Sequence, residues 1–310
     1  MGPGHRWGVR FALAALLAAS VVAWSGSVRA GGNDFRLNGV DGNGRGILFS
    51  CQPLPCAADD AAFAAFASEL SFVLSPRLAS PAATLGVAGF EFGLLWSGHF
   101  VSDEDHWQLT EDGQRTGEGA PFLQTMQLEV RKGLPLSFEV AATMGWLVDS
   151  QIFMPGLELK WAFQEGYDFM PDFALRGAIN TMVGSPDLSL TNVTTDLVIS
   201  KPIPAGGIVR ITPFVSLGAL FTAASSQVVD PTPTTFVEQG DPPIRVPDTE
   251  NDIAFEAVGL AEEVFAKVTG GVRARFSLVD LLVQGELMMF RDGELIGPAG
   301  TVTTKLALIF

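Results

Sequence analysis

A repeated alternation of apolar and polar side chains, from residue 84 to the end of the chain, is the feature that most constrains the fold. The segment LELKWAFQ at residues 157–164 is its clearest case. Successive side chains of a strand point to opposite faces, so a period of two predicts strands with one apolar and one polar face. After residue 30, no stretch has the roughly 20 apolar residues of a transmembrane helix, although the mean hydropathy is +0.30. Only helices and closed barrels satisfy the backbone in lipid, so the pattern indicates a barrel.

Ten segments carry this pattern. They are residues 90–97, 124–131, 137–146, 157–164, 173–182, 192–201, 208–221, 265–276, 279–290 and 302–310. Most are close to the ~9 to 11 residues with which a tilted strand crosses a bilayer. The prediction is an all-β fold, a single antiparallel up-and-down transmembrane barrel of about ten strands, with eight or twelve as alternatives. Residues 252–264 are the least regular part and are expected to form a loop helix or to extend a strand.

The lengths of the connections give an independent check on the strand count. An even-stranded barrel with both chain ends in the periplasm alternates short periplasmic turns with longer outer loops. Counted back from Phe310, the turns fall near Ser277, Pro204, Asp168 and Gly133. The two longest gaps, residues 101–120 and 223–263, then become outer loops. A shift by one strand would place them in the periplasm, so ten strands are favoured.

Residues 1–30 have the composition of a secretory signal peptide. Arg6 and Arg10 precede an apolar run at residues 11–24, and a cleavage site is expected near Ala30. Removing the three arginines of this segment from the 19 basic residues leaves 16, against 34 acidic residues, so the mature chain has a charge of -18. Binding to nucleic acid needs a basic face, so this charge argues against such a partner.

Two cysteines, Cys51 and Cys56, lie in an exported leader that we assign to residues 31–83. Because the compartment beyond the inner membrane is oxidising, they are expected to form a disulfide. A redox-active pair is the alternative, but the four-residue spacer departs from Cys-x-x-Cys and no βαβ pattern surrounds it. The barrel domain then covers residues 84–310, and the leader is expected on the periplasmic side.

A short helix is predicted in the second half of the leader, beginning at Asp59 or Asp60. Its apolar residues Phe63, Phe66 and Leu70 recur at helical spacing. We expect this helix to rest at the periplasmic mouth of the barrel. A plug inside the lumen is the alternative.

The last nine residues, 302–310, end on Phe310, with Leu306 and Leu308 on the same strand face. This ending resembles the C-terminal assembly signal of bacterial outer-membrane β-barrel proteins. The resemblance implies a multi-pass protein of the Gram-negative outer membrane, with its lipid and the barrel-assembly machinery as partners. One departure is that the chain has a single tyrosine, Tyr167, although its 23 phenylalanines and six tryptophans can fill part of an aromatic belt. A soluble β-sandwich, the alternative, needs no terminal aromatic residue.

The polar strand faces predict the residues that line the lumen. The acids are Glu91, Glu129, Glu139, Glu158, Asp196, Asp280 and Glu286, and the bases are Arg131, Lys160, Arg176, Arg210, Lys267, Arg273, Arg275 and Lys305. These seven acids and eight bases nearly cancel, so the acidic surplus lies in the leader and loops. Opposite charges can pair across a narrow interior, and about eight strands make a barrel that side chains just fill. We predict a mostly filled lumen or a thin water path, with a charge ladder for small solutes as the alternative.

The predicted outer loops are rich in carboxylates. They contain Asp103, Glu104, Asp105, Glu111, Asp112, Glu118, Asp230, Glu238, Asp241, Asp248, Glu250 and Asp252. Such groups can share divalent cations with anionic lipid headgroups, because hard cations prefer oxygen ligands. Their spacing matches no defined calcium loop, so we expect a solvated loop surface and assign no metal site or cofactor.

Two classes of function follow. The first is a non-enzymatic barrel, either a narrow, porin-like passive channel for small solutes or a structural and surface-binding component. The alternative is an outer-rim hydrolase, as in ten-stranded membrane proteases that this chain resembles in architecture alone. There, His99 or His106 beside the acids at residues 103–105 would activate water, or Ser97 or Ser102 would serve as nucleophile. Nothing in the sequence requires these groups to converge, so no catalytic residue is assigned.

Overall fold

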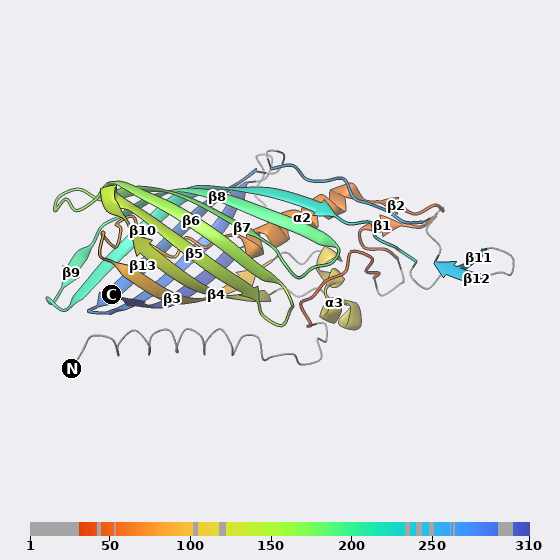
Figure 1. Ribbon diagram of the computed structural model, residues 1–310, viewed down its shortest axis with the longest axis horizontal. Coiled ribbons are helices and arrows are strands. Elements are labelled where there is room, and N and C mark those ends of the chain that lie inside the picture. Colours follow the sequence, from red (N-terminus) through yellow and green to blue (C-terminus); the bar gives the residue numbers. More distant parts are fainter. Residues whose placement is uncertain are drawn as a thin grey trace, which may run out of the picture. The chain divides into compact units, whose positions relative to one another are not determined.

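Ten long antiparallel strands form a closed barrel in the part of the chain that the structure describes (Figure 1). They are β3 (Phe90–Phe100), β4 (Phe122–Gly133), β5 (Phe138–Leu147), β6 (Phe153–Gln164), β7 (Asp172–Thr181), β8 (Leu188–Ser200), β10 (Val209–Ser226), β13 (Val264–Phe276), β14 (Val279–Phe290) and β15 (Gly300–Ile309). Each pairs with its neighbour in the chain, β15 pairs with β3, and β10 pairs with β13 across the longest loop. The predicted ten-stranded up-and-down barrel is confirmed.

The computed structural model describes residues 31–41, 45–52, 54–101, 105–117, 122–232, 236–239, 244–247, 251–260, 262, 264–290 and 300–310. The signal peptide expected at residues 1–30 lies outside these ranges. Among the described residues, no helix has both the length and the hydropathy that a membrane crossing requires.

The alternation of the sequence becomes an alternation of burial. On β6, Lys160 is buried, whereas Leu157 and Leu159 are 64% and 51% exposed. The same holds around the barrel, where large apolar side chains cover the outer face and polar and charged ones turn inward. The C-terminal strand follows this rule, since Leu306, Leu308 and Phe310 are exposed.

The connections divide the barrel into two ends. We call "turn end" the end with the connections at residues 134–137, 165–171, 201–208 and 277–278, and "loop end" the end with those at residues 101–121, 148–152, 182–187, 227–263 and 291–299. Phe310 lies at the turn end, where its backbone pairs with that of Phe90. The two longest connections, residues 101–121 and 227–263, both fall at the loop end, as the parity of the strands predicts, and the loop end also has the short connections 148–152 and 182–187.

Several small elements lie in the connections and in the leader. They are β1 (Phe49–Ser50), β2 (Ala57–Ala58), η1 (Asp105–Leu109), α3 (Glu111–Thr116), η2 (Pro135–Ser137), β9 (Ile203–Ala205), β11 (Phe236–Gln239) and β12 (Ile244–Pro247). Cys51 and Cys56 form the expected disulfide. Residues 251–260 form neither a helix nor a strand. They pair with the end of β10 through a bridge between Val258 and Ala224, and with the residues after β10 through a bridge between Ile253 and Val229.

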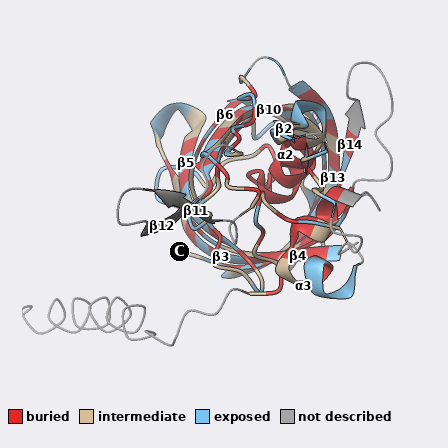
Figure 2. Cartoon of the chain, turned by 90° about the vertical axis from the view of Figure 1, so that its right-hand side faces the viewer, coloured by how far each residue is buried: buried red, intermediate tan, exposed pale blue. Residues whose placement is uncertain are grey.

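The leader helix α2 (Asp60–Leu74) lies inside the barrel (Figure 2). Asp59 caps it by accepting a hydrogen bond from the amide of Ala62 at 3.0 Å. Near its C-terminal end, the hydroxyl of Ser71 donates to Asn192 at 2.6 Å. The expectation that the helix rests at the periplasmic mouth was wrong. Every side chain of residues 66–74 is buried, on all sides of the helix, and the lumen provides that enclosure.

The leader crosses the whole barrel from one end to the other. Its first residues lie at the loop end, where the Asn33 amide donates to the Asp149 carbonyl at 2.9 Å and the Glu111 amide donates to Asp34 at 2.8 Å. Its last residues leave at the turn end and lead into β3. The beginning of the leader therefore shares an end with the long loops. The sequence predicts a leader in the periplasm and long loops that face outward. Because the start of the leader lies at the same end as the long loops, these two expectations exclude each other.

Candidate functional site

A set of buried charges forms the middle of the lumen, and we call it the central network. Its members on the wall are Glu91, Glu129, Arg131, Glu139, Glu158, Lys160, Arg176, Asp196, Lys267, Glu286 and Lys305, and Arg77 joins them from the leader. Each of the twelve is at most 5% exposed. The structure places all eleven wall members on the lumen face, where the sequence expects them.

Strand register brings part of this network together. Neighbouring strands place Glu139 opposite Lys160, Lys160 opposite Arg176, and Arg176 opposite Asp196. Residues directly opposite each other on one face are the closest side-chain neighbours in a sheet. A row of four charges across β5 to β8, two cations flanked by an acid on each side, is therefore a direct consequence of the pairing.

Arg131, on β4, is the cation of the central network with the most acidic partners. Its guanidinium contacts Glu129 at 2.9 Å and Glu139 at 2.8 Å, and it also bonds to Glu158. Glu91 lies 3.8 Å away. Five donors in a planar fork allow one arginine to satisfy several carboxylates at once, which a lysine cannot match.

Two lysines link the remaining acids. The Lys305 ammonium lies 2.5 Å from both Glu91 and Glu129. Across the barrel, Lys267 lies 3.3 Å from Asp196 and 3.5 Å from Glu286. Each wall member of the central network thus has at least one partner of opposite sign, as burial requires.

Arg77 of the leader completes the charge balance. Without it, the wall of the central network has six acids and five bases, and Arg77 supplies the sixth positive charge. Its guanidinium donates to Glu286 at 2.6 Å and to the carbonyl of Val73, at the end of α2, at 3.1 Å. The carbonyl of Arg77 in turn accepts a hydrogen bond from Arg176 at 2.8 Å. The leader is therefore bound to both sides of the network.

Sequence reasoning missed Arg77, although one signal was available. Arg77 is the only charged residue between Glu69 and Glu91. A single charge in so long an uncharged stretch of a barrel protein needs a buried partner if the stretch is enclosed. The stretch carries no strand pattern, however, so nothing local indicates that it enters the lumen.

The leader after α2 also bonds to the wall through its backbone. The Lys160 ammonium donates to the Pro81 carbonyl at 3.0 Å, and Lys305 donates to the Ala79 carbonyl at 3.1 Å. The Leu85 amide donates to Glu139 at 2.8 Å. Helix α2 fills the part of the lumen nearer the loop end, and the leader residues after α2 fill the part nearer the turn end.

Four predicted lumen residues lie apart from the central network, at the turn end. Arg275 makes two hydrogen bonds to Asp280, at 2.8 and 2.9 Å, and Arg273 lies 3.8 Å from the same carboxylate. Arg210 is exposed and makes no ion pair with any described residue. The lining that seemed balanced in sequence is thus divided into a neutral centre and a positive turn end.

The two histidines of the barrel occupy different buried sites. His99 is fully buried on the lumen face of β3, between the hydroxyls of Thr301 at 2.9 Å and Thr125 at 2.8 Å. His106 lies in η1, where its Nε2 is 3.3 Å from Glu69 of α2. The indole of Trp107 donates to the same carboxylate at 2.7 Å.

These placements do not assemble a site on the outer rim. His99 belongs to the lumen wall because β3 extends to Phe100, beyond the predicted strand. Ser97 contacts Thr303 at 2.9 Å. Ser102 and the acids at positions 103 and 104 lie outside the described residues.

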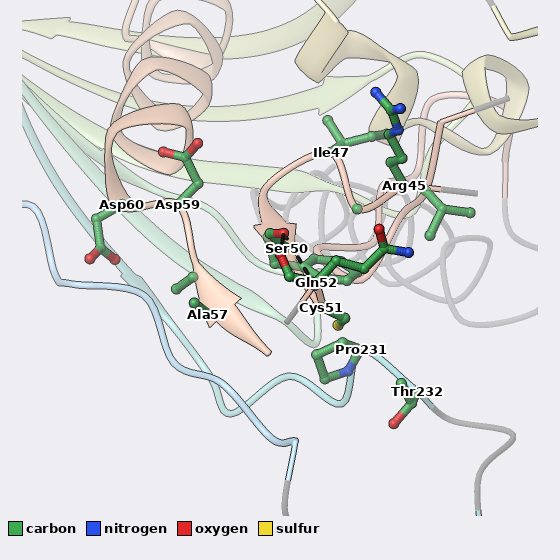
Figure 3. A pocket seen from close by; sticks show the side chains of 14 residues that line it. Arg45, Ile47, Ser50, Cys51, Gln52, Ala57, Asp59, Asp60, Pro231 and Thr232 are labelled. Atoms are coloured by element: carbon green, nitrogen blue, oxygen red, sulfur yellow. Dashed lines mark hydrogen bonds between the residues drawn. The ribbon is translucent and has the colours of Figure 1, made fainter. Parts of the chain in front are cut away.

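A polar cavity of about 790 Å³ opens at the loop end, beside the disulfide (Figure 3). Arg45, Ser50, Gln52, Asp59, Asp60 and Thr232 are among the residues that line it. Figure 3 shows Arg45 on one side of this space and the two aspartates on the other. The cavity offers both signs of charge together with hydroxyl and amide groups, which suits a small polar molecule.

The described loop acids form no metal site. No group of three or more His, Cys, Asp or Glu side chains in the described ranges is placed to hold a metal ion. Asp112, for example, pairs with Arg115 at 3.2 Å. The acids at positions 118, 241, 248 and 250 lie outside those ranges.

Comparison with known proteins gives matches to solved structures alone. No family model and no curated protein matches the chain. The N-terminal β-barrel domain of OprF from Pseudomonas aeruginosa is similar at 8% identity and a TM-score of 0.29, over 73% of this chain and 99% of that one. LpxR from Salmonella typhimurium has 9% identity, a TM-score of 0.31 and coverage of 70% and 100%. The translocator domain of the autotransporter NalP from Neisseria meningitidis has 10% identity, a TM-score of 0.32 and coverage of 81% and 97%. Likenesses this distant assign no activity to the chain.

Proposed function

We propose that this protein is a bacterial outer-membrane barrel whose lumen is closed by its own leader. Its function is then binding at the cell surface, through the loop end of the barrel. The observation that carries the proposal is the path of the leader, which fills the lumen and neutralises the central network through Arg77. The buried ion pair of Arg77 with Glu286 and the hydrogen bonds from Arg176, Lys160 and Lys305 to leader carbonyls hold this segment. Removal of one partner of the buried pair leaves an uncompensated charge. A barrel closed in this way does not act as a passive channel.

The outer face of the barrel supports the membrane setting. Soluble proteins rarely expose contiguous apolar patches larger than a few hundred Å². Here, outward leucines on separate strands, such as Leu128, Leu157 and Leu217, are each more than 60% exposed. A continuous apolar surface around a closed barrel matches a lipid environment, in which every backbone group is paired between strands.

The membrane setting predicts a large effect of one outward charge. Leu157→Arg, in the middle of the outer face of β6, is expected to destabilise the barrel in lipid vesicles by about 2 to 4 kcal/mol. The control is Leu136→Arg in the turn between β4 and β5, where the side chain is 82% exposed and an interfacial charge costs about 0 to 1 kcal/mol. Guanidinium unfolding of both variants in vesicles measures the difference. Equal stability of the two variants would contradict a lipid-facing β6.

The closed lumen can be tested by a cross-link between leader and wall. Ser71 of α2 contacts Asn192 and Thr222 on the lumen face, whereas the side chain of the neighbouring Thr191 faces outward. The variant S71C/T222C is expected to form a disulfide in nearly all molecules in the membrane, and the control S71C/T191C is expected to form none. In planar bilayers, both the wild type and the cross-linked variant should be silent. Reproducible channels in the cross-linked variant would overturn the proposal of a closed barrel.

The loop end provides the surface for binding. It holds the polar cavity beside the disulfide, the start of the leader and the longest loop. We further propose that the loop end faces the outside of the cell, so that the cavity is accessible to polar molecules there. A rim hydrolase gains no support, because His99 and His106 are both buried.

A further inference from the structure

One side of the turn end of the lumen, formed by β10, β13 and β14, carries more positive than negative charge. Arg210, Arg273 and Arg275 lie on these three strands with one carboxylate, Asp280. Asp280 satisfies Arg275 with two hydrogen bonds and lies within 3.8 Å of Arg273. Three guanidinium groups and one carboxylate leave a surplus of two positive charges.

Strand pairing concentrates this surplus. Arg210 on β10 lies directly opposite Arg275 on β13, and Arg273 is the next inward residue along β13. Like charges directly opposite each other destabilise a sheet. The arrangement lacks a counter-charge on the side of Arg210, because Asp280 lies on β14, on the other side of Arg275.

The other charged groups of the turn end do not supply that counter-charge. Glu165 bonds to Thr84, and Asp172 accepts from the Gly166 amide at 2.9 Å. The nearest acids of the central network already have partners. Glu91 pairs with Lys305, and Glu139 pairs with Lys160 and Arg131.

A cavity of about 270 Å³ opens where the surplus lies. Arg210 and Arg275 line it, together with Pro204, Gly207, Ile208 and Ser277. Behind Arg275, Arg273 is 8% exposed and its Nε makes no hydrogen bond to a described residue. The cavity thus has two guanidinium groups at its surface and a third, buried one behind them.

We propose that this cavity binds a phosphate group through Arg210 and Arg275, with Arg273 adding to its positive potential. The guanidinium fork matches two phosphate oxygens, and such charge-assisted pairs are stronger than neutral hydrogen bonds. A phosphate monoester carries about -1.5 to -2 charges near pH 7, which matches the surplus of two. The cavity is large enough for the phosphate and a small substituent. A soluble phosphate ester and a lipid headgroup at the turn-end membrane surface share this chemistry.

The test uses the refolded mature chain in a non-ionic detergent, titrated calorimetrically with glycerol 3-phosphate and, separately, with short-chain phosphatidic acid, whose headgroup is also a phosphate monoester. Saturable binding of either ligand is expected, with an affinity that falls as salt is added. Arg210→Gln should weaken it at least tenfold, whereas Arg115→Gln, which removes an exposed arginine at the loop end, should leave it unchanged. Arg210 has no ion pair with a described residue, so its removal leaves no buried charge behind.

The outcomes separate the two sources of phosphate. Binding of glycerol 3-phosphate that Arg210→Gln weakens at least tenfold supports a soluble ester. Binding of phosphatidic acid alone, with the same weakening, supports a lipid headgroup. No saturable binding of either ligand, or equal weakening by Arg210→Gln and Arg115→Gln, overturns the proposal. None of these outcomes depends on whether the lumen is closed.

Discussion

Arg77→Gln is expected to release the leader from the lumen and to turn a silent barrel into a fluctuating channel. The substitution leaves Glu286 buried with Lys267 at 3.5 Å as its remaining cation, and leaves the central network with six acids and five bases. Removing one partner of a buried ion pair costs about 3 to 5 kcal/mol. Channel openings in planar bilayers and a lower midpoint in guanidinium unfolding should both report this loss.

Two further variants make the expectation specific. Arg36→Gln removes an arginine that pairs with Asp187 at 3.7 Å and whose side chain is 54% exposed, so its effect should stay below about 1 kcal/mol. The double variant Arg77→Gln/Glu286→Gln removes both charges and should recover much of the stability and the silence. If Arg77→Gln is as stable and as silent as Arg36→Gln, Arg77 does not hold the leader.

Arg131→Gln is expected to have the largest effect on folding of the wall itself. Arg131 contacts three carboxylates closely and lies 3.8 Å from a fourth, Glu91. Its loss leaves four buried acids with the neighbouring lysines and Arg176, so we expect a loss of at least about 3 to 5 kcal/mol. The yield of folded barrel, measured by its altered migration on unheated gels, should fall steeply.

The matched control for this effect is Arg115→Gln, which removes an exposed arginine of a loop helix. Arg131→Lys keeps the charge but loses the planar fork, so its yield should lie between those of the wild type and Arg131→Gln. Folding of Arg131→Gln with the same yield as Arg115→Gln would show that the network does not support the wall.

The strands and their faces could be predicted because both are local properties. In residues 157–164, for example, the side chains alone indicate which face turns outward. The cap of α2 at Asp59 and the disulfide are equally local. Each depends on residues a few positions apart.

Height along the barrel axis could not be predicted in the same way. Arg210 and Arg131 have the same inward parity, yet Arg131 lies in the central network and Arg210 lies at the turn end. Parity determines the face of a residue, whereas the stagger between strands determines its level. The sequence therefore indicated one balanced lining where the structure has two separate sets.

The path of the leader is also a non-local property. The pattern of α2 predicts a helix, but its burial on all sides depends on strands more than a hundred residues later, such as β8. The position of His99 was equally hard to predict. Because β3 extends to Phe100, beyond the predicted end of the strand at residue 97, His99 lies in the wall and not in the expected loop.

The course of the leader has a consequence for the order of events in assembly. The pairing of β15 with β3 closes the ring, and the leader runs through that ring with a disulfide-linked segment beyond the loop end. A bulky end cannot easily be pulled through an opening that side chains already fill. The simplest order is for the strands to wrap around the leader, so that the leader is the template on which the last strand closes.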